Sequence, residues 1–169
     1  MTNNLNKATN KEHLPKVQAW TDGSSDQKTR AGSGVVLINA KGSKLCIARH
    51  TPYKNTSSQA EAFAVLLALR ELTKPTDITI HTDSAYCFNA VNNWIHGWAK
   101  NKWKNSNKKE VGQKEIWKEV YELMKIHQVN MVKVPAHSGI ELNELADKLA
   151  NLGAHGYESR KLTTVDKLK

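Results

Sequence analysis

The hydrophobic pattern divides the chain into short strand-like stretches and longer stretches with helical periodicity. Alternating or short continuous apolar runs predict strands at residues 17–22, 31–38, 43–48, 77–83 and 129–134. Apolar positions spaced by three and four predict helices at residues 58–72, 84–89, 93–100, 112–126 and 141–152. Three strands with short links, followed by alternating helices and strands, indicate an α/β domain that begins with an antiparallel meander.

The first predicted strand carries a carboxylate where an apolar side chain would be expected. Side chains alternate across a strand, so Gln18, Trp20 and Asp22 share one face, and Gly23 ends the run. Burying an aspartate is costly unless it is paired, hydrogen-bonded or bound to a metal. An Asp-Gly pair is also typical of a tight turn. Both interpretations are open from this stretch alone.

Three further acids occupy unusual positions, although each also has an ordinary explanation. Glu61 shares the apolar stripe of its predicted helix, but a glutamate in the first turn is favoured by the helix dipole. Asp83 ends the fourth predicted strand, where it could simply cap the next helix. Asp147 flanks the apolar face of the last predicted helix. A strand–helix–strand crossover makes the first and fourth strands parallel, so we expect Asp22 and Asp83 at the same carboxyl edge of the sheet.

Positive charge is concentrated in one segment. The formal net charge is +9, and the residues from Trp94 to Lys118 include seven lysines, two glutamates and four of the five tryptophans. Surplus lysine is typical of a solvated surface. Lysines interleaved with large aromatic rings also suit the backbone and the sugar or base faces of nucleic acid, which is the interpretation that we favour.

Length and composition predict one catalytic domain over residues 16–154, with a flexible arm over 1–15 and a polar tail over 155–169. Cys46 and Cys87 are too few and too far apart for a disulfide framework or a zinc module, which favours a reducing, intracellular setting. No apolar run approaches the ~18 residues of a membrane span. We therefore expect a cytoplasmic monomer with no membrane partner.

Together, the four acids indicate a metal site that handles phosphate. They combine with the basic aromatic segment and with a histidine, His137, that precedes a Ser-Gly pair. Carboxylate oxygens suit Mg²⁺ or Mn²⁺, which keep several waters and bind substrate phosphate as well as protein. The set of residues therefore favours a functional interpretation of Asp22 over a turn.

Five ordered motifs resemble those of the type 1 ribonuclease H family. They are Thr21-Asp22-Gly23-Ser24, Gln59-Ala60-Glu61, Thr82-Asp83-Ser84-Ala85-Tyr86, Val134-Pro135-Ala136-His137-Ser138-Gly139 and Asn143-Glu144-Leu145-Ala146-Asp147. The resemblance covers residues 16–154, and the segment from Asn93 to Val111 is similar to the basic protrusion of the cellular members. It implies a ribonuclease H-like α/β fold, with a five-stranded mixed sheet in the order 3-2-1-4-5 flanked by helices. It also implies endonucleolytic cleavage of the RNA strand of an RNA–DNA hybrid, leaving 5′-phosphate and 3′-hydroxyl ends.

The resemblance also implies a catalytic set. Asp22, Glu61, Asp83 and Asp147 match the acids that bind two Mg²⁺ ions, or Mn²⁺, with Asp22 as the expected bridging ligand. Two such ions about 4 Å apart activate a water and stabilise the departing 3′-oxygen. His137 matches the mobile-loop histidine that shuttles a proton or assists product release, although a histidine in isolation is also commonly structural.

Contacts with the hybrid are implied for a larger group. Those expected on the RNA strand are Gly23, Ser24, Thr56, Ser57 and Ser58. Those expected on the DNA strand are Trp94, Trp98, Lys100, Lys102, Lys104, Lys108, Lys109 and Gln113. Three places depart from the common pattern: many members have Asn followed by Asn or Gln at the two serines, Asn in place of Gln113, and Gln or Met in place of Ala85. These departures bear on hybrid affinity and not on the reaction type.

Three alternatives compete with a free-standing cellular-type enzyme. They are the ribonuclease H domain of a retroelement reverse transcriptase, a DNA recombinase or nuclease with the same fold, and a non-catalytic module that binds hybrids. The basic protrusion argues against the first, because many retroviral relatives lack it. Four clustered acids argue against the last, because binding alone gives no reason to keep costly buried charges.

Overall fold

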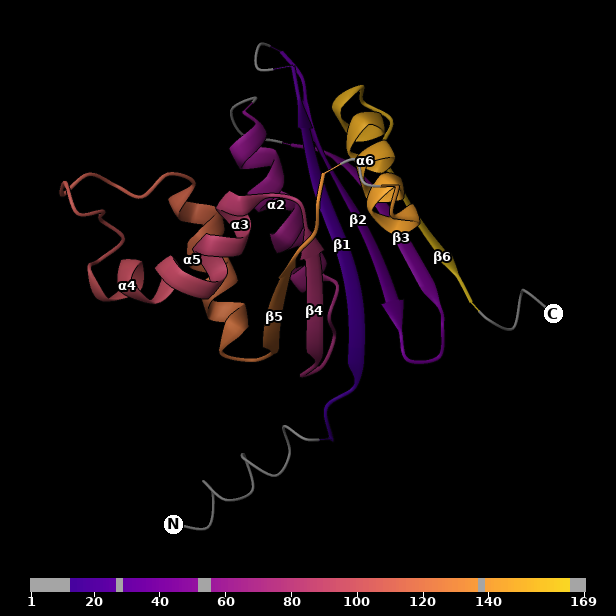
Figure 1. Ribbon diagram of the computed structural model, residues 1–169, viewed down its shortest axis with the longest axis horizontal. Coiled ribbons are helices and arrows are strands. Elements are labelled where there is room, and N and C mark those ends of the chain that lie inside the picture. The colour runs from indigo at the N-terminus through magenta and orange to yellow at the C-terminus, as the bar shows by residue number, and fades with distance from the viewer. Residues whose placement is uncertain (1–12, 27–28, 52–55, 137–138, 165–169) are drawn as a thin grey trace.

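A computed structural model describes residues 13–26, 29–51, 56–136 and 139–164 of the chain (Figure 1). The strands are β1 (Lys16–Ser25), β2 (Ala31–Asn39), β3 (Lys44–His50), β4 (Asp77–Thr82), β5 (Gln128–Lys133) and β6 (Ser159–Thr163). The helices are α2 (Ser57–Arg70), α3 (Ala85–Asn89), the π-helical turn η2 (Ala90–Trp94), α4 (Ile95–Lys100), α5 (Lys114–Met124) and α6 (Glu141–Ala154). No helix in these ranges is long and apolar enough to cross a membrane.

All the strands belong to one mixed sheet, in the order β5-β4-β1-β2-β3-β6. β1 pairs in parallel with β4 and antiparallel with β2, and β4 pairs in parallel with β5. This order confirms the predicted 3-2-1-4-5 arrangement of the first five strands. The expectation of five strands is corrected to six, because β6 pairs antiparallel with β3.

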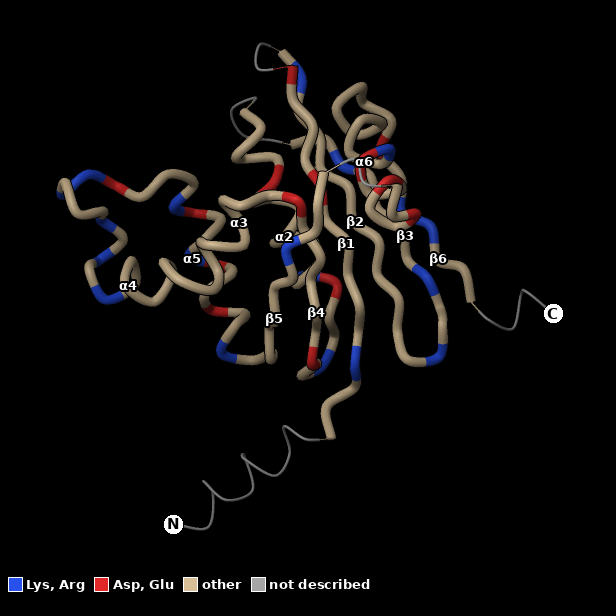
Figure 2. Tube along the Cα trace, in the orientation of Figure 1, with Lys and Arg blue, Asp and Glu red and all other residues tan. Residues whose placement is uncertain are grey.

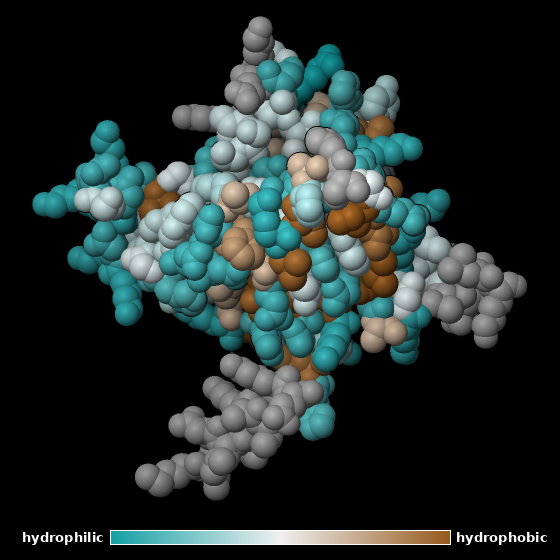
Figure 3. All heavy atoms as spheres, viewed as in Figure 1, coloured by the Kyte–Doolittle hydropathy of each residue, from teal (hydrophilic) through white to brown (hydrophobic). Residues whose placement is uncertain are grey.

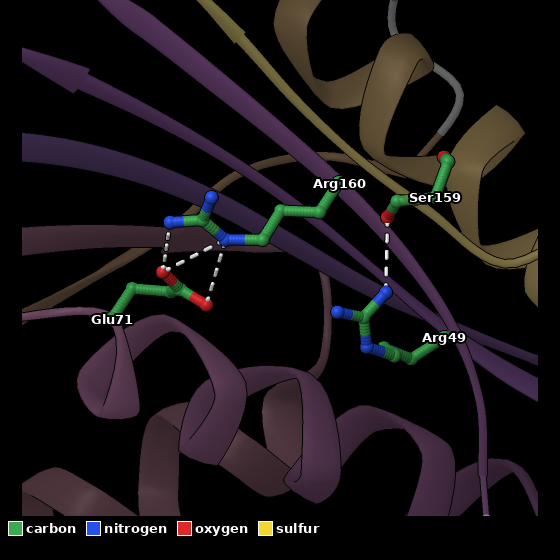
Figure 4. A network of polar contacts seen from close by, with 4 residues as sticks. All are labelled: Arg49, Glu71, Ser159 and Arg160. Carbon is green, nitrogen blue, oxygen red and sulfur yellow. Dashed lines mark hydrogen bonds and ion pairs between the residues drawn. The ribbon is translucent and has the colours of Figure 1, made fainter.

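The additional strand lies in the segment that we expected to be a polar tail, residues 155–169. Most of its side chains are exposed, so the hydrophobic pattern contains little sign of a strand. Arg160 forms an ion pair with Glu71 at 2.9 Å, and Arg49 Nη1 donates to the carbonyl oxygen of Ser159 at 3.1 Å (Figure 4). The backbone ladder to β3 and these polar contacts hold β6 with little help from apolar burial.

The sheet is covered on both faces. Helices α2, α3 and α5 lie on one side of it and α6 lies on the other (Figure 1). Successive side chains of β2 point to opposite faces of the sheet. Val35 belongs to the larger core with α2 and α5, whereas Val36 packs with Ala146 and Leu149 of α6. The sheet edge where β1 and β4 end is thus bordered by helices from both layers.

Some element boundaries differ from those predicted. β1 continues to Ser25 instead of ending at Asp22, because its antiparallel ladder with β2 extends past the end of the ladder with β4. The last helix was predicted to end at residue 152 but continues to Ala154, and the absence of a side chain at Gly153 lets it approach β3. The first two residues of the helix predicted at residues 93–100 belong to the π-helical turn η2, and the rest form α4.

Candidate active site

The parallel pairing of β1 with β4 brings two aspartates together. The ladder ends with Thr21 opposite Thr82, so the next residue of each strand is Asp22 or Asp83. Asp22 is only 4% exposed, and its Oδ1 accepts a hydrogen bond from the backbone N–H of Gly23 at 2.9 Å. The prediction that the two aspartates meet at the carboxyl edge of the sheet is confirmed.

Helix α2 brings Glu61 to the same edge through a close approach to β1. The Thr56 hydroxyl caps the helix by accepting a hydrogen bond from the backbone N–H of Gln59 at 3.3 Å. A Cβ atom on Gly23 would stand 2.4 Å from the backbone nitrogen of Glu61 and 2.6 Å from the carbonyl carbon of Ala60. A glycine is therefore required where β1 passes the first turns of α2.

Asp22, Glu61 and Asp83 form a cluster with the spacing of metal ligands. One carboxylate oxygen from each lies within 4.8 Å of the others. The Oε2 atom of Glu61 is buried and has no hydrogen-bond partner among the described residues. A buried carboxylate oxygen without a partner is costly, and a cation supplies the missing interaction. Three carboxylates in this arrangement fit a hard divalent ion such as Mg²⁺ or Mn²⁺.

Asp147 borders the cluster from the opposite face of the sheet. Gly34 lies opposite Asp22 in the ladder between β1 and β2, and a Cβ atom there would stand 2.1 Å from the carbonyl oxygen of Ala146. Helix α6 therefore approaches the sheet closely at the residue before Asp147. The Asp147 carboxyl group is close enough to that of Asp22 to raise its pKa, so the fourth predicted acid lies beside the first.

The clustering raises the pKa values of the acids. Burial, then the charge of Asp83 and the neighbouring Asp147 carboxyl group, raise the pKa of Asp22 from 3.8 to about 7. Burial, and then the charges of Asp22 and Asp83, raise the pKa of Glu61 well above its usual value. Carboxylates that share a site repel one another unless they are protonated or bound to a cation. The site therefore favours a bound cation, whose binding at neutral pH would release protons.

The residues predicted to contact RNA lie at the same edge. Thr56, Ser57 and Ser58 are exposed at the start of α2. The hydroxyl of Ser24 donates to Oδ1 of Asn151 at 2.5 Å. Asn151 was not identified from the sequence, although its position four residues after Asp147 places it on the same stripe of α6. An open depression of about 520 Å³ runs along this stripe and is lined by Asp147 and Asn151.

The stretch from the end of η2 to the residue before α5 carries the predicted DNA contacts. Its lysines are all exposed; they are Lys100, Lys102, Lys104, Lys108 and Lys109. Figure 2 shows this basic segment projecting from the body on the side away from α6, and Figure 3 shows its hydrophilic surface. Trp94 is 41% exposed, whereas Trp98 is half-buried and packs against Trp94 and Trp117 with ring centroids 5.9 and 6.4 Å away. Trp94 is therefore the ring that is more available to a ligand.

Gln113, also predicted to contact DNA, is bonded to an aromatic side chain. It precedes α5, and its side chain hydrogen-bonds the hydroxyl of Tyr86 instead of capping the helix. Neither Tyr86 nor the Trp117 indole that also contacts it was identified from the sequence as part of the site. The remaining predicted site residue, His137, lies outside the residues that the structure describes.

Comparison with known proteins yields a consistent set of relatives. The family model for RNase H matches residues 15–155. A Ribonuclease H of Cereibacter sphaeroides is 35% identical over 151 residues, which cover 87% of this chain and 100% of that protein. The crystal structure of LC9-RNase H1, a type 1 RNase H with the type 2 active-site motif, has a TM-score of 0.76 at 23% identity and covers 89% of this chain and 78% of that chain. The solution structure of the PFV RNase H domain has a TM-score of 0.67 at 28% identity and covers 85% of this chain and 96% of that chain. The chain therefore belongs to the ribonuclease H family.

Proposed function

We propose that the protein is an endonuclease that hydrolyses the RNA strand of RNA–DNA hybrids with two divalent metal ions, leaving 5′-phosphate and 3′-hydroxyl ends. The observation that carries the proposal is the carboxylate cluster of Asp22, Glu61 and Asp83, with Asp147 beside Asp22, in a chain of the ribonuclease H family. Clustered buried acids are unfavourable for folding, which supports a catalytic role over a purely binding one.

The four acids would hold the ions, which we infer to be Mg²⁺, with Mn²⁺ as a substitute. Two such ions, when bound, supply an activated water on one side of the phosphorus and positive charge at the departing 3′-oxygen on the other. Asp22 would be the central ligand, because Glu61 and Asp83 each place an oxygen within 4.8 Å of one of its own and Asp147 lies beside it. The Gly23 N–H orients its carboxylate, and Glu61 offers an oxygen without any other partner.

The chain's remaining site residues would position the hybrid. The RNA strand would contact Gly23 and Ser24, which lie in β1 beside the cluster, and Thr56, Ser57 and Ser58 at the start of α2. The DNA strand would lie against the aromatic surface of Trp94 and Trp98, and the lysines of the projecting segment would neutralise its phosphates. His137 would move a proton or assist product release. The free thiols of Cys46 and Cys87 suit a reducing compartment, so we infer an enzyme of the cytoplasm. We also propose that it acts as a monomer.

The test is incubation with end-labelled RNA–DNA hybrid, duplex DNA and duplex RNA, each in Mg²⁺ and in EDTA. We expect cleavage of the RNA strand of the hybrid alone, in Mg²⁺ alone, and 5′-phosphate ends on the products. Cleavage of duplex DNA would instead indicate a DNA nuclease of the same fold. Metal-independent cleavage would contradict the role assigned to the acids.

A variant pair tests the site itself. Asp22→Asn should abolish turnover while hybrid binding survives, because the variant keeps the shape and the hydrogen bond to Gly23 but loses the charge. Asp77→Asn is the matched control. Asp77 lies at the opposite end of β4 and accepts a hydrogen bond from Asn130 Nδ2 at 2.9 Å, which an asparagine oxygen can also accept. Equal activity of the two variants would place the active site elsewhere.

A further inference from the structure

The hydroxyl of Tyr86 joins two side chains from the N-terminal part of α5 and the residue before it. It accepts a hydrogen bond from Nε1 of Trp117 at 2.8 Å and contacts Oε1 of Gln113. Trp117 is fully buried, and its ring meets that of Tyr86 edge-on with centroids 5.8 Å apart. Tyr86 belongs to α3, which begins two residues after Asp83. A polar connection therefore leads from the segment that carries a cluster acid to the start of α5.

The direction of these hydrogen bonds follows from the donors available. An indole N–H can only donate, so the Tyr86 oxygen is the acceptor from Trp117. The phenolic hydrogen then needs an acceptor, and Oε1 of Gln113 is the near one, since the carbonyl oxygen of Gly112 is 3.5 Å away, at the limit for a hydrogen bond. Burial raises the pKa of Tyr86 to about 12, so the phenol keeps this hydrogen at neutral pH.

This arrangement sets the orientation of the Gln113 amide. With Oε1 bonded to Tyr86, the Nε2 group is left as a donor, and it has no acceptor among the described residues. The residue also has φ of 55°, a left-handed conformation that non-glycine residues rarely adopt. Its side chain lines a cavity of about 420 Å³ together with Gln59 and Lys114.

The nearest positive charge at this cavity is already paired. Lys114 Nζ lies 3.0 Å from a carboxylate oxygen of Glu110, and Glu115 also lines the cavity. Recognition of a phosphate here therefore depends on a directed donor more than on net charge. An amide held in one orientation supplies such a donor, and contacts of this kind fix the register of a nucleic acid on a protein.

We propose that Tyr86 and Trp117 are positioning residues, which hold the Gln113 amide so that Nε2 donates a hydrogen bond to one phosphate of the DNA strand. The inference rests on the proposed function, in which Gln113 contacts DNA. Because Tyr86 and Asp83 are three residues apart, the contact also links the position of that phosphate to the position of the metal cluster. Tyr86 thus acts on substrate register and not on the chemical step.

Two variants and a matched control separate this role from a structural one. Gln113→Glu keeps an oxygen beside Tyr86 but replaces the proposed donor with a second oxygen. Tyr86→Phe removes the hydroxyl that orients the amide. Tyr121→Phe is the control, because Tyr121 packs against the same hydrophobic core, beside Trp103, and its hydroxyl makes no hydrogen bond to a described residue.

Two readouts are used. Equilibrium binding of a fluorescent hybrid is measured in EDTA, and kcat and KM are measured in Mg²⁺. Losing one oriented hydrogen bond to a charged group predicts about a 10- to 100-fold rise in Kd and KM for both variants. We expect kcat of Tyr86→Phe to stay near the wild-type value and Tyr121→Phe to match wild type throughout.

Hybrids with a single neutral methylphosphonate in the DNA strand identify the contact. Scanning this group along the strand should reveal one position at which wild-type binding weakens about 10- to 100-fold more than binding by Tyr86→Phe or Gln113→Glu. The double variant should bind like Gln113→Glu alone, because both substitutions remove the same contact.

Either of two results would overturn the proposal: unchanged hybrid binding by Gln113→Glu, or equal sensitivity of wild type and both variants at every methylphosphonate position. Thermal unfolding reports whether Tyr86→Phe folds. If Tyr86→Phe does not fold, binding by Gln113→Glu, at the half-buried rim of the cavity, decides whether the proposal holds. Binding without cleavage by the wild-type protein would refute the proposed catalytic function, while the binding measurements still decide the positioning role of Tyr86. Failure of the wild-type protein to bind hybrid would refute both.

Discussion

Replacing Asp22 by asparagine should stabilise the metal-free protein while it destroys activity. The pKa of Asp22 is raised from 3.8 to about 7, chiefly by burial and then by the charge of Asp83. The folded state therefore binds this proton more tightly than the unfolded chain, so its contribution to stability is present below about pH 4 and is lost as the pH rises through about 7. A shift of this size corresponds to about 4 kcal/mol. That is a large share of the roughly 5–15 kcal/mol typical of a domain.

The assay is urea unfolding in EDTA between pH 5 and pH 8, with wild type, Asp22→Asn and Asp77→Asn compared at each pH. At pH 5 the Asp22 carboxyl of the wild type is mostly protonated in the folded state, so Asp22→Asn should be only slightly more stable than wild type. At pH 8 we expect it to be more stable than wild type by up to about 4 kcal/mol, with a flatter dependence on pH. Asp77→Asn should follow the wild-type curve.

Adding Mg²⁺ should reverse part of this difference. An ion that binds only the folded state stabilises it by mass action, and the variant has lost a ligand. Wild type should therefore gain stability in millimolar Mg²⁺ at pH 8, and Asp22→Asn should gain less. The reasoning would be refuted if Asp22→Asn were less stable than wild type at pH 8 in EDTA, or if both proteins had the same pH slope.

Three other predictions concern the helix contact, the basic segment and the added strand. Gly34→Ala would force a Cβ atom against the carbonyl oxygen of Ala146 and displace α6, so we expect a loss of about 1–3 kcal/mol in unfolding free energy and a lower kcat; an unchanged kcat would contradict the role of this contact. Neutralising Lys100, Lys102 and Lys104 should weaken hybrid binding. The slope of log K against log salt concentration should become less negative by roughly 0.7–0.9 for each phosphate that is no longer neutralised. An unaltered slope would mean that these lysines only form a solvated surface. Glu71→Gln breaks the ion pair with Arg160, which is largely exposed, so thermal unfolding should show a cost below about 1 kcal/mol and activity should not change.

Most of the strands could be predicted from local pattern. Alternation and short apolar runs report which face of a strand is buried, and they located five strands. The same logic brought Asp22 and Asp83 to one edge, because a crossover between parallel strands puts their carboxyl ends together. The family resemblance added the order of these strands and the roles of Glu61 and Asp147, whose individual positions also have ordinary explanations.

The rest depended on contacts between segments far apart in the chain. β6 has few apolar side chains, and its pairing with β3 and its ion pair to the end of α2 have no local signature. The half-burial of Trp98 and the bonding of Tyr86 to Gln113 arise because α3, α4 and α5 pack together. Sequence periodicity describes the environment of one segment at a time and cannot report such meetings.

The carboxylate cluster depends both on local sequence and on tertiary packing. The identities of its acids and their places at element ends are local properties of the sequence. The spacing of Asp22, Glu61 and Asp83 within 4.8 Å, the nearness of Asp147 and the raised pKa of Asp22 exist only because Gly23 and Gly34 let α2 and α6 approach β1 and β2 from opposite faces. Charge repulsion and desolvation grow steeply with proximity and burial, so tertiary packing turns separate carboxylates into one acidic cluster.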